Sequence, residues 1–375
     1  MRRVLVAGGG TAGHVFPAVA VARELTRIAD IEPVFVGVSD RLEAQLVPDA
    51  GFRLHTVDAV SVPRKLSPAL LRLPSALRRA VKQVERIAEK EGAQAAVTFG
   101  GYVSFPTSWA AHRRGLPLVL HEQNAVPGMA NRVAARWAYR IAVSFPGSAD
   151  RFRRKERCAV TGNPVREEIL TLDRDARRAE ARQRFGLDPD RPTLLVFGGS
   201  QGARALNRAI VDAHAHWGDT DIQILHAAGR GLYPEAASAW EQARATDPGP
   251  TVRVLDFIDD MCDAYAAADV VVCRSGATSI AELTTLGIPA VLVPYPHATG
   301  DHQRLNAEAL ENTGGAISVP DDELDADRLL AEVRPLLDDP EAHARMVAAS
   351  RAFGRPDAAA NVARLVLERL DGSTT

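Results

Sequence analysis

The chain contains one local pattern twice: a short apolar run, a glycine-rich turn, and a segment with helical periodicity. The first copy runs from residues 4–7 into 9–13, and the second from 193–197 into 198–202. A turn of this kind at a helix N-terminus presents backbone N–H groups that bind anions. Two copies therefore predict two α/β domains that face one anionic ligand across a cleft.

Apolar runs alternate with amphipathic stretches along the chain, which is the order of βαβ units and parallel sheets. Several of the runs are apolar almost throughout, as in strands that helices cover on both faces. The predicted fold is therefore α/β, with two Rossmann-like doubly wound domains. Ligands in such sheets bind at the carboxyl ends of the strands. The expected strands are 4–7, 33–38, 95–99, 118–121, 141–144, 193–197, 222–226, 252–257, 270–273 and 290–294.

A turn-rich stretch at residues 161–164 predicts the domain boundary. The expected domains are 1–163 and 164–353, with a final helix in 354–375 that packs back on the first domain. The chain's net charge of −2 is +11 over the first 163 residues and −13 over the rest. A basic first half indicates an anionic partner, such as nucleic acid, an anionic membrane or an anionic substrate, unless the surface is merely uneven.

Other bulk features narrow the class of protein. No run of 18 apolar residues occurs, so no membrane-spanning helix is expected. The three cysteines lack zinc-like spacing and are expected to be buried thiols, so neither a metal nor another cofactor is predicted.

Between residues 60 and 87, leucines at 66, 70, 71, 73 and 77 interleave with basic residues. This pattern fits a segment on an anionic bilayer and equally a helix with its apolar face in the core.

The first glycine turn literally fits the dinucleotide fingerprint, and Asp40 could serve as the ribose ligand, so an NAD enzyme has to be considered. The second turn does not fit that fingerprint. His14 follows the first turn directly, at the positive end of the next helix, where a neutral imidazole able to accept a proton is expected. A structural histidine at the helix start is the alternative.

Polar residues crowd the ends of three other expected strands. Glu122, Gln123 and Asn124 offer a carboxylate and two amides for sugar hydroxyls, or form a solvated turn. Glu282 lies about two turns into the helix that follows Ser275, where its carboxylate can accept from both hydroxyls of a ribose. N–H groups at the start of that helix suit a diphosphate. Helix capping and a solvated face are the alternatives there.

These segments together resemble the MurG family, which implies a two-domain GT-B fold. Its members are UDP-N-acetylglucosamine:undecaprenyl-pyrophosphoryl-muramoyl-pentapeptide N-acetylglucosaminyltransferases. The family's first turn usually reads GGTGGH, and Ala12 here replaces a glycine, which requires a negative φ at this position. The matching strings are GGTAGHVFPAVAVA (9–22), FGGYVSFP (99–106), PLVLHEQNAVPGMANR (117–132), TGNPVR (161–166), VFGGSQGARALN (196–207), FIDDM (257–261), ADVVVCRSGATSIAEL (268–283) and GIPAVLVPYPHATGDHQRLNA (287–307).

The resemblance implies an inverting, metal-independent transfer of GlcNAc from UDP-GlcNAc to the muramoyl 4-hydroxyl of lipid I, which forms lipid II for peptidoglycan. It implies that His14 or Glu122 is the catalytic base, and that His14, Tyr102, Glu122 and Gln123 bind the acceptor. It also implies a peripheral location on the cytoplasmic face of the cell membrane, with other cell-wall and division proteins as further candidate partners. The implied donor contacts are Thr11, Ala12, Gly13, Asn124, Arg166, Ser200, Ile258, Ala277, Thr278, Glu282 and Gln303.

Three alternatives stay open at this point. A UDP-GlcNAc 2-epimerase, or another UDP-sugar transferase of the same fold, would share the donor half; an epimerase would convert UDP-GlcNAc without an acceptor. A nucleotide-binding scaffold of the cell-wall machinery would bind UDP without turnover. An NAD dehydrogenase would bind NAD instead of UDP.

Overall fold

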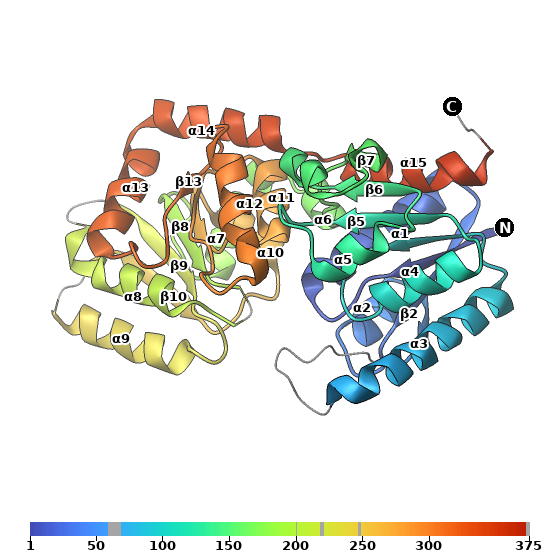
Figure 1. Cartoon of the computed structure of the whole chain (residues 1–375). Helices are drawn as coiled ribbons and strands as arrows, with labels where there is room; N and C mark the ends of the chain where they lie inside the picture. Colours follow the sequence, from blue (N-terminus) through green and yellow to red (C-terminus); the bar gives the residue numbers. More distant parts are fainter. Residues whose placement is uncertain (59–68, 200, 218–220, 247–248, 373–375) are drawn as a thin grey trace. The chain divides into compact units, whose positions relative to one another are not determined.

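The computed structural model describes residues 1–58, 69–199, 201–217, 221–246 and 249–372. The chain divides into two compact units (Figure 1). The first unit contains Met1–Arg166 and Arg355–Thr375, and the second contains Glu167–Gly354.

The first unit is built on a seven-stranded sheet in the order β3-β2-β1-β4-β5-β6-β7, with every pair parallel. Successive residues of β1 point to opposite faces, as the two-residue period of a strand requires. Leu5 and Ala7 face a core formed with α3, α4 and α5, whereas Val4 and Val6 face a core formed with α1 and α15. The strands are β1 (Arg2–Ala7), β2 (Ile31–Gly37), β3 (Arg53–Thr56), β4 (Ala95–Thr98), β5 (Leu118–Glu122), β6 (Arg140–Val143) and β7 (Cys158–Val160). The helices are α1 (Ala12–Ile28), α2 (Glu43–Asp49), α3 (Ala69–Glu91), α4 (Ser104–Arg113), α5 (Met129–Ala134) and α15 (Ala358–Leu370), with 3₁₀ turns η1 (Pro146–Arg151) and η2 (Lys155–Arg157).

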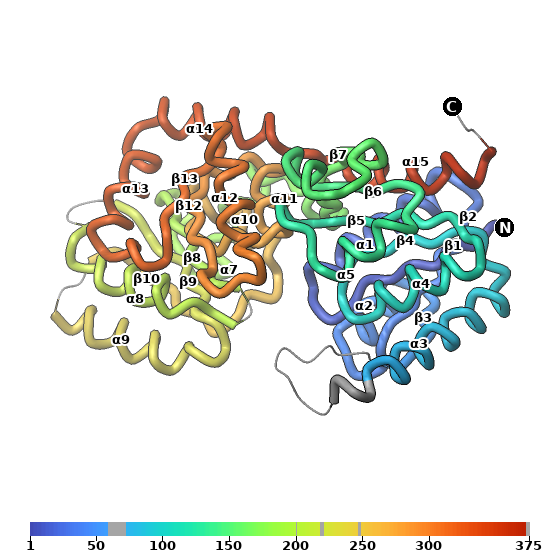
Figure 2. The backbone as a smooth tube through the Cα atoms, in the orientation of Figure 1, coloured from blue at the N-terminus to red at the C-terminus, as the bar shows by residue number. Residues whose placement is uncertain are grey.

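The last helix, α15, completes this unit although it lies at the far end of the sequence. It packs against α1 (Figure 2). Its residues Val362, Ala363 and Val366 are buried in the same core as Val4 and Val6. None of the described helices is long and apolar enough to cross a bilayer.

The second unit is built on a six-stranded parallel sheet in the order β10-β9-β8-β11-β12-β13. Leu194 and Val196 of β8 are buried in its main core together with residues of α8, α9 and α13. The strands are β8 (Thr193–Phe197), β9 (Gln223–Ala227), β10 (Thr251–Leu255), β11 (Val270–Cys273), β12 (Ala290–Leu292) and β13 (Ile317–Ser318). The helices are α6 (Glu167–Leu170), α7 (Arg174–Arg184), α8 (Arg204–Asp212), α9 (Tyr233–Thr246), α10 (Met261–Ala267), α11 (Ala277–Leu286), α12 (His302–Glu311), α13 (Ala326–Asp338) and α14 (Pro340–Phe353), with 3₁₀ turns η3 (His214–His216) and η4 (Thr299–Asp301).

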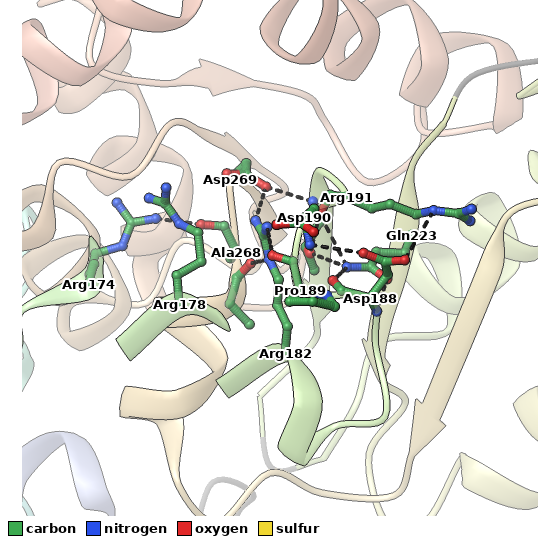
Figure 3. Close-up of polar contacts among 12 residues, drawn as sticks. Arg174, Arg178, Arg182, Asp188, Pro189, Asp190, Arg191, Gln223, Ala268 and Asp269 are labelled. Carbon is green, nitrogen blue, oxygen red and sulfur yellow. Dashed lines mark hydrogen bonds and ion pairs between the residues drawn. The ribbon is translucent and has the colours of Figure 1, made fainter. Parts of the chain in front are cut away.

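A buried arginine fixes the amino end of this second sheet (Figure 3). The Arg182 side chain on α7 is only 4% exposed and donates to the carbonyls of Ala267 and Pro189 and to Asp269. Asp269 also accepts the backbone N–H of Thr193, the first residue of β8, at 2.7 Å. These contacts join α7 to the last residue of α10 and to the residues that precede β8 and β11, at the edge opposite the glycine turn.

All ten expected strands are present, with small differences in their ends, and the structure adds β3, β7 and β13. These three lie at the edges of their sheets and contain two to four residues. Edge strands are half-exposed and need no continuous apolar run.

Candidate functional site

Three loops meet at the carboxyl edge of the first sheet. Ala7 ends β1 beside Thr98 of β4, and Thr98 lies beside Leu120 of β5. The turns after β1 and β4 touch, because a Cβ on Gly101 would lie 2.0 Å from the carbonyl oxygen of Gly9. The residues predicted after these strands therefore share one edge of the unit.

His14 is held in the first turn of α1 by the loop that precedes it. Its Nδ1 lies 3.2 Å from the carbonyl oxygen of Gly9 and 3.0 Å from Thr11 Oγ1. A carbonyl can only accept, so its hydrogen bond places the proton on Nδ1 and leaves the lone pair on Nε2. No described residue hydrogen-bonds Nε2, which lies against Gly100. Burial lowers the pKa of His14, although the Gly9 carbonyl and the charge of Glu43 oppose that shift. The imidazole is thus neutral and able to accept a proton at Nε2.

Glu122, the other candidate base, has both carboxylate oxygens engaged. Oε1 accepts the backbone N–H of Asn124 at 3.0 Å, and Oε2 accepts the backbone N–H of Gly128 at 3.1 Å and the amide of Asn131 at 2.8 Å. The residue is 2% exposed. Burial raises the pKa of Glu122, and these hydrogen bonds oppose the rise. The contacts fix the loop between β5 and α5.

The neighbouring candidates differ in how accessible they are. Gln123 is buried and donates to the carbonyl of Phe99, at the end of β4. Asn124 is half-buried, and its carbonyl accepts from Ser148 at 3.0 Å. Tyr102 is 43% exposed, and its ring lies against Gly10.

The remaining candidates of this unit lie at or near the start of α1. Thr11 is exposed and is the N-cap of α1, and Ala12 and Gly13 form its first turn. The backbone at Ala12 has a negative φ, so the methyl group that replaces a glycine causes no strain. The guanidinium of Arg166 lies over the ring of Phe16 on α1, with its Cζ 4.6 Å from the ring centroid.

Glu43 was missed by the sequence reasoning. It is the first residue of α2 and is 1% exposed. Its carboxylate accepts the backbone N–H of Gly10 at 2.9 Å and that of Val38 at 3.2 Å. A Cβ on Gly9 would lie 2.4 Å from Glu43 Oε1, so the glycine turn packs directly on this carboxylate.

The second glycine turn lies at the carboxyl edge of the second sheet, between β8 and α8. Gly199 and Gly202 have φ of +80° and +72°, which only glycine adopts without strain. A Cβ on Gly202 would lie 2.1 Å from the carbonyl oxygen of Ala228, after β9. Ser200, a predicted donor contact in this turn, lies outside the described residues.

A buried chain of hydrogen bonds supports that turn. Trp240 Nε1–H donates to Nδ1 of His226, so the proton of His226 is on Nε2, which donates to Asn207 Oδ1 at 3.0 Å. The Asn207 amide then donates to the carbonyl of Ala228, also at 3.0 Å. Burial lowers the pKa of His226 to about 4, so the ring is neutral. Each polar side-chain atom of Asn207, His226 and Trp240 therefore has a hydrogen-bond partner, as burial requires.

The other predicted donor residues of this unit follow β11 and β12. Gly276 is the N-cap of α11, and no side chain caps that helix start, where Ala277 and half-buried Thr278 form the first turn. Glu282 is 4% exposed, and its Oε2 accepts from the hydroxyl of Tyr265 at 2.9 Å. Ser275 joins this turn to α12, because its hydroxyl donates to the carbonyl of Gln303 at 2.8 Å.

Gln303 and Ile258 complete the predicted set. Gln303 Oε1 accepts the backbone N–H of Tyr295 at 2.9 Å, which orients the amide beside the end of β12. Ile258, after β10, is 5% exposed. The preceding ring, Phe257, lies 4.5 Å from the guanidinium of Arg230. The predicted donor residues described in this unit lie in the segments that follow β10, β11 and β12, three parallel strands of one sheet.

Comparison with known proteins decides the family. The family model of the glycosyltransferase family 28 N-terminal domain matches residues 4–143, and that of the C-terminal domain matches residues 193–362. A protein of Nocardioides sp. is 46% identical, with 99% of each chain covered. A protein of Acidothermus cellulolyticus is 47% identical, with 97% of this chain and 96% of that protein covered. Both are named UDP-N-acetylglucosamine–N-acetylmuramyl-(pentapeptide) pyrophosphoryl-undecaprenol N-acetylglucosamine transferase.

The chain belongs to the MurG family of glycosyltransferases. The crystal structure of Acinetobacter baumannii MurG matches with a TM-score of 0.76 and 29% identity, over 98% of this chain and 100% of that one. The two parallel sheets thus form the two-domain GT-B fold expected from the sequence. A UDP-GlcNAc 2-epimerase of Neisseria meningitidis bound to UDP-GlcNAc matches with a TM-score of 0.72 and 12% identity, over 98% of this chain and 100% of that one, which shows a shared fold alone.

Proposed function

We propose that this MurG-family glycosyltransferase moves GlcNAc from UDP-GlcNAc to the muramoyl 4-hydroxyl of lipid I, with His14 as the base. The observation that carries the assignment of the base is the geometry of the His14 ring. Nδ1 is tied to the carbonyl of Gly9, and Nε2 has no hydrogen-bond partner among the described residues. The proposed reaction is based on the names of the relatives, and the proposed proton acceptor is based on the geometry of the His14 ring.

The proposed reaction is a single displacement with inversion at the anomeric carbon. The 4-hydroxyl oxygen forms a bond to this carbon as the bond from the carbon to the β-phosphate oxygen breaks. The hydroxyl proton moves to Nε2 of His14, and the electron pair of the broken bond leaves on UDP. A base whose pKa lies near or below the working pH is neutral when the substrate binds, which suits this role.

Glu122 is the weaker candidate for the base, although it stays a proposed acceptor residue with Tyr102 and Gln123. Both of its oxygens already accept hydrogen bonds from its own loop. Taking a proton would break or weaken at least one of these contacts in a buried place, at a cost of about 1–3 kcal/mol. We assign Glu122 the task of holding the loop that presents Asn124.

The second unit is the proposed donor site. N–H groups at the 198–202 turn and at the uncapped start of α11 would bind the diphosphate and stabilise the charge that builds up on the leaving UDP. Glu282 would accept from the ribose hydroxyls, and Gln303 would bind a sugar hydroxyl. From the first unit, the family resemblance adds Arg166 and the start of α1 at Thr11.

We also propose that the first unit contacts the cytoplasmic face of an anionic membrane. Of the segment singled out in the sequence, residues 60–68 lie outside the described residues, and Leu77 packs on the core. A groove beside α5 is a stronger basis, because its arginines form no ion pair with any described residue and Met129, which also lines it, is 83% exposed. Uncompensated arginines beside an exposed apolar side chain suit an anionic lipid surface. The arginines are Arg132, Arg136, Arg151, Arg153 and Arg154.

The base assignment is tested with H14Q in a radiolabel transfer assay from UDP-GlcNAc to a lipid I analogue. We expect kcat to fall at least a hundredfold with the UDP dissociation constant within twofold of wild type. H216Q is the matched control, because His216 is exposed in the second unit, and it should keep wild-type kcat. Wild-type kcat in H14Q would contradict the assignment. A reaction with UDP-GlcNAc alone tests for an epimerase, which would form product without an acceptor.

The membrane proposal is tested by co-sedimentation with vesicles. The double variant R151E/R154E should bind vesicles that contain anionic phosphatidylglycerol far more weakly than wild type. R204E/R208E, which reverses two exposed arginines of the second unit, should bind as wild type does. Binding that depends on neither anionic lipid nor salt would count against an electrostatic surface.

A further inference from the structure

The glycine turn after β1 packs on a buried carboxylate. Glu43 comes from α2, and its two oxygens accept the N–H groups of Gly10 and Val38, which follow β1 and β2. The residue is 1% exposed, and no described cation forms an ion pair with it. Glu43 also packs closely against the end of β2, because a Cβ on Gly37 would lie 2.7 Å from Glu43 Cγ.

This arrangement changes what the first glycine turn can do. In a dinucleotide-binding turn the N–H groups face a phosphate. Here the N–H of Gly10 already faces a carboxylate, and a phosphate brought to it would meet a like charge in a buried place. The two glycine turns of the chain therefore have different roles, although their sequences look alike. The first turn shapes the start of α1, where His14 lies.

His14 is the titratable group that the negative charge affects. Gly9 contacts both groups, because its carbonyl accepts from Nδ1 of His14 and a Cβ on it would lie 2.4 Å from Glu43 Oε1. The carboxylate therefore favours the protonated form of the ring. The other ionisable groups at the ends of the neighbouring strands are His121 and Glu122 of β5 and Tyr102 after β4. His121 is buried and neutral, and both oxygens of Glu122 accept hydrogen bonds from its own loop. Arg41 lies over the Tyr102 ring at 5.7 Å and pairs with exposed Asp40. Among these groups the Glu43 carboxylate is the one on which the turn before His14 packs directly.

We propose that Glu43 is a positioning residue for the transfer, which holds the 8–11 turn in place and stabilises the imidazolium of His14 after it takes the acceptor's proton. The inference rests on the proposed function only in that it assumes His14 is the base. A protonated ring beside a buried carboxylate is favoured because little water screens the two charges. Glu43 takes no proton in this step, because its two oxygens keep the hydrogen bonds from Gly10 and Val38.

The test compares E43Q with wild type in a nuclear magnetic resonance titration of histidine-labelled protein, with H14Q used to assign the His14 signal. We expect E43Q to lower the pKa of His14 by about one pH unit. The acid limb of the kcat/KM profile should move to lower pH by the same amount, and kcat on the plateau should fall about tenfold. A role confined to loop structure would lower kcat and leave both the pKa and the limb unmoved, and that result would overturn the proposal.

D40N is the matched control. It also removes a carboxylate, but Asp40 lies three residues before Glu43 and its side chain is 74% exposed. It should leave the His14 pKa unchanged, since water screens exposed charges. E43D keeps the charge but withdraws it by one methylene, so it should lower the pKa less than E43Q does. If E43Q does not fold, E43D is compared with D40N, and an unchanged His14 pKa in E43D contradicts the proposal.

The titration also separates this inference from the assignment of the base. It is measured on the free protein and needs no turnover. Full kcat in H14Q would show that His14 is not the base, yet the effect of Glu43 on the His14 pKa would still be visible in the E43Q titration. Loss of kcat in H14Q with no change of the His14 pKa in E43Q would support His14 as the base and rule out the proposed role of Glu43.

Discussion

Replacing Asn207 by alanine should uncouple the second glycine turn from the core beneath it. The Asn207 amide accepts from Nε2–H of His226 and donates to the carbonyl of Ala228, and both of these groups are buried. N207A leaves one donor and one acceptor without partners. At about 1–3 kcal/mol for each such group, the loss is about 2–6 kcal/mol, and we take about 3 kcal/mol as the expected value.

The loss should appear in thermal melting and in UDP binding. A unit of this size loses about 2–4 °C of melting temperature per kcal/mol, so the second unit should melt about 6–12 °C lower. The freed carbonyl of Ala228 contacts Gly202 in the turn that is proposed to hold the diphosphate. UDP affinity, measured by calorimetry, should therefore fall about tenfold, which corresponds to about 1.4 kcal/mol.

A second variant separates stability from binding. W240F removes the N–H that donates to Nδ1 of His226, two hydrogen bonds away from the Ala228 carbonyl. It should lower the melting temperature but leave the UDP dissociation constant within twofold of wild type. Exposed Asn312 provides the neutral control N312A. The reasoning would be refuted if N207A melted within about 2 °C of wild type, or if W240F weakened UDP binding as much as N207A does.

Three further predictions follow from the described contacts. Gly100 has a φ of +92°, and a Cβ on it would lie 2.9 Å from the His14 ring, so G100A should lower kcat at least tenfold and leave UDP affinity intact. Gly115 has a φ of +68° and no atom within 4 Å of such a Cβ, so its control variant G115A should lower stability alone. R182M breaks a buried ion pair and should lower the free energy of unfolding by about 3–5 kcal/mol in urea titrations, with unchanged specific activity. His121 and His226, with pKa values of about 4, are neutral in the fold and protonate more readily when unfolded, so their contribution to stability is complete above pH 6.5 and shrinks towards pH 4. Melting temperature between pH 7 and 5 measures this loss, at about 1.4 kcal/mol per pH unit for each histidine.

The sequence predicted the strands that carry the site because those strands are buried on both faces. Thr193–Phe197 and Val270–Cys273 consist of apolar or β-branched residues and are followed directly by small or polar residues. A short stretch of sequence is enough to recognise this pattern. Arg53–Thr56 reads RLHT and pairs on one side only, so its place in the sheet depends on the neighbouring strand and not on its own composition.

The supporting residues of the site could not be predicted in the same way. Glu43 lies in a polar stretch that reads as the start of a surface helix, and its partner Gly10 is 33 residues away. His226 is a single polar residue inside an apolar strand, and its partners come from α8 and α9. For Glu122 the sequence indicated a carboxylate at a strand end, but the three donors that engage it become visible only when the loop is folded.

A crystal structure with UDP-GlcNAc tests the central claim most directly, namely that the second unit holds the donor and the first supplies the base. The account predicts the ribose hydroxyls at Glu282 and the diphosphate at the 198–202 turn and the start of α11. It predicts no phosphate at the N–H of Gly10, which Glu43 occupies. A nucleotide bound along the strand ends of the first unit, with its phosphates on the 8–11 turn, would contradict it.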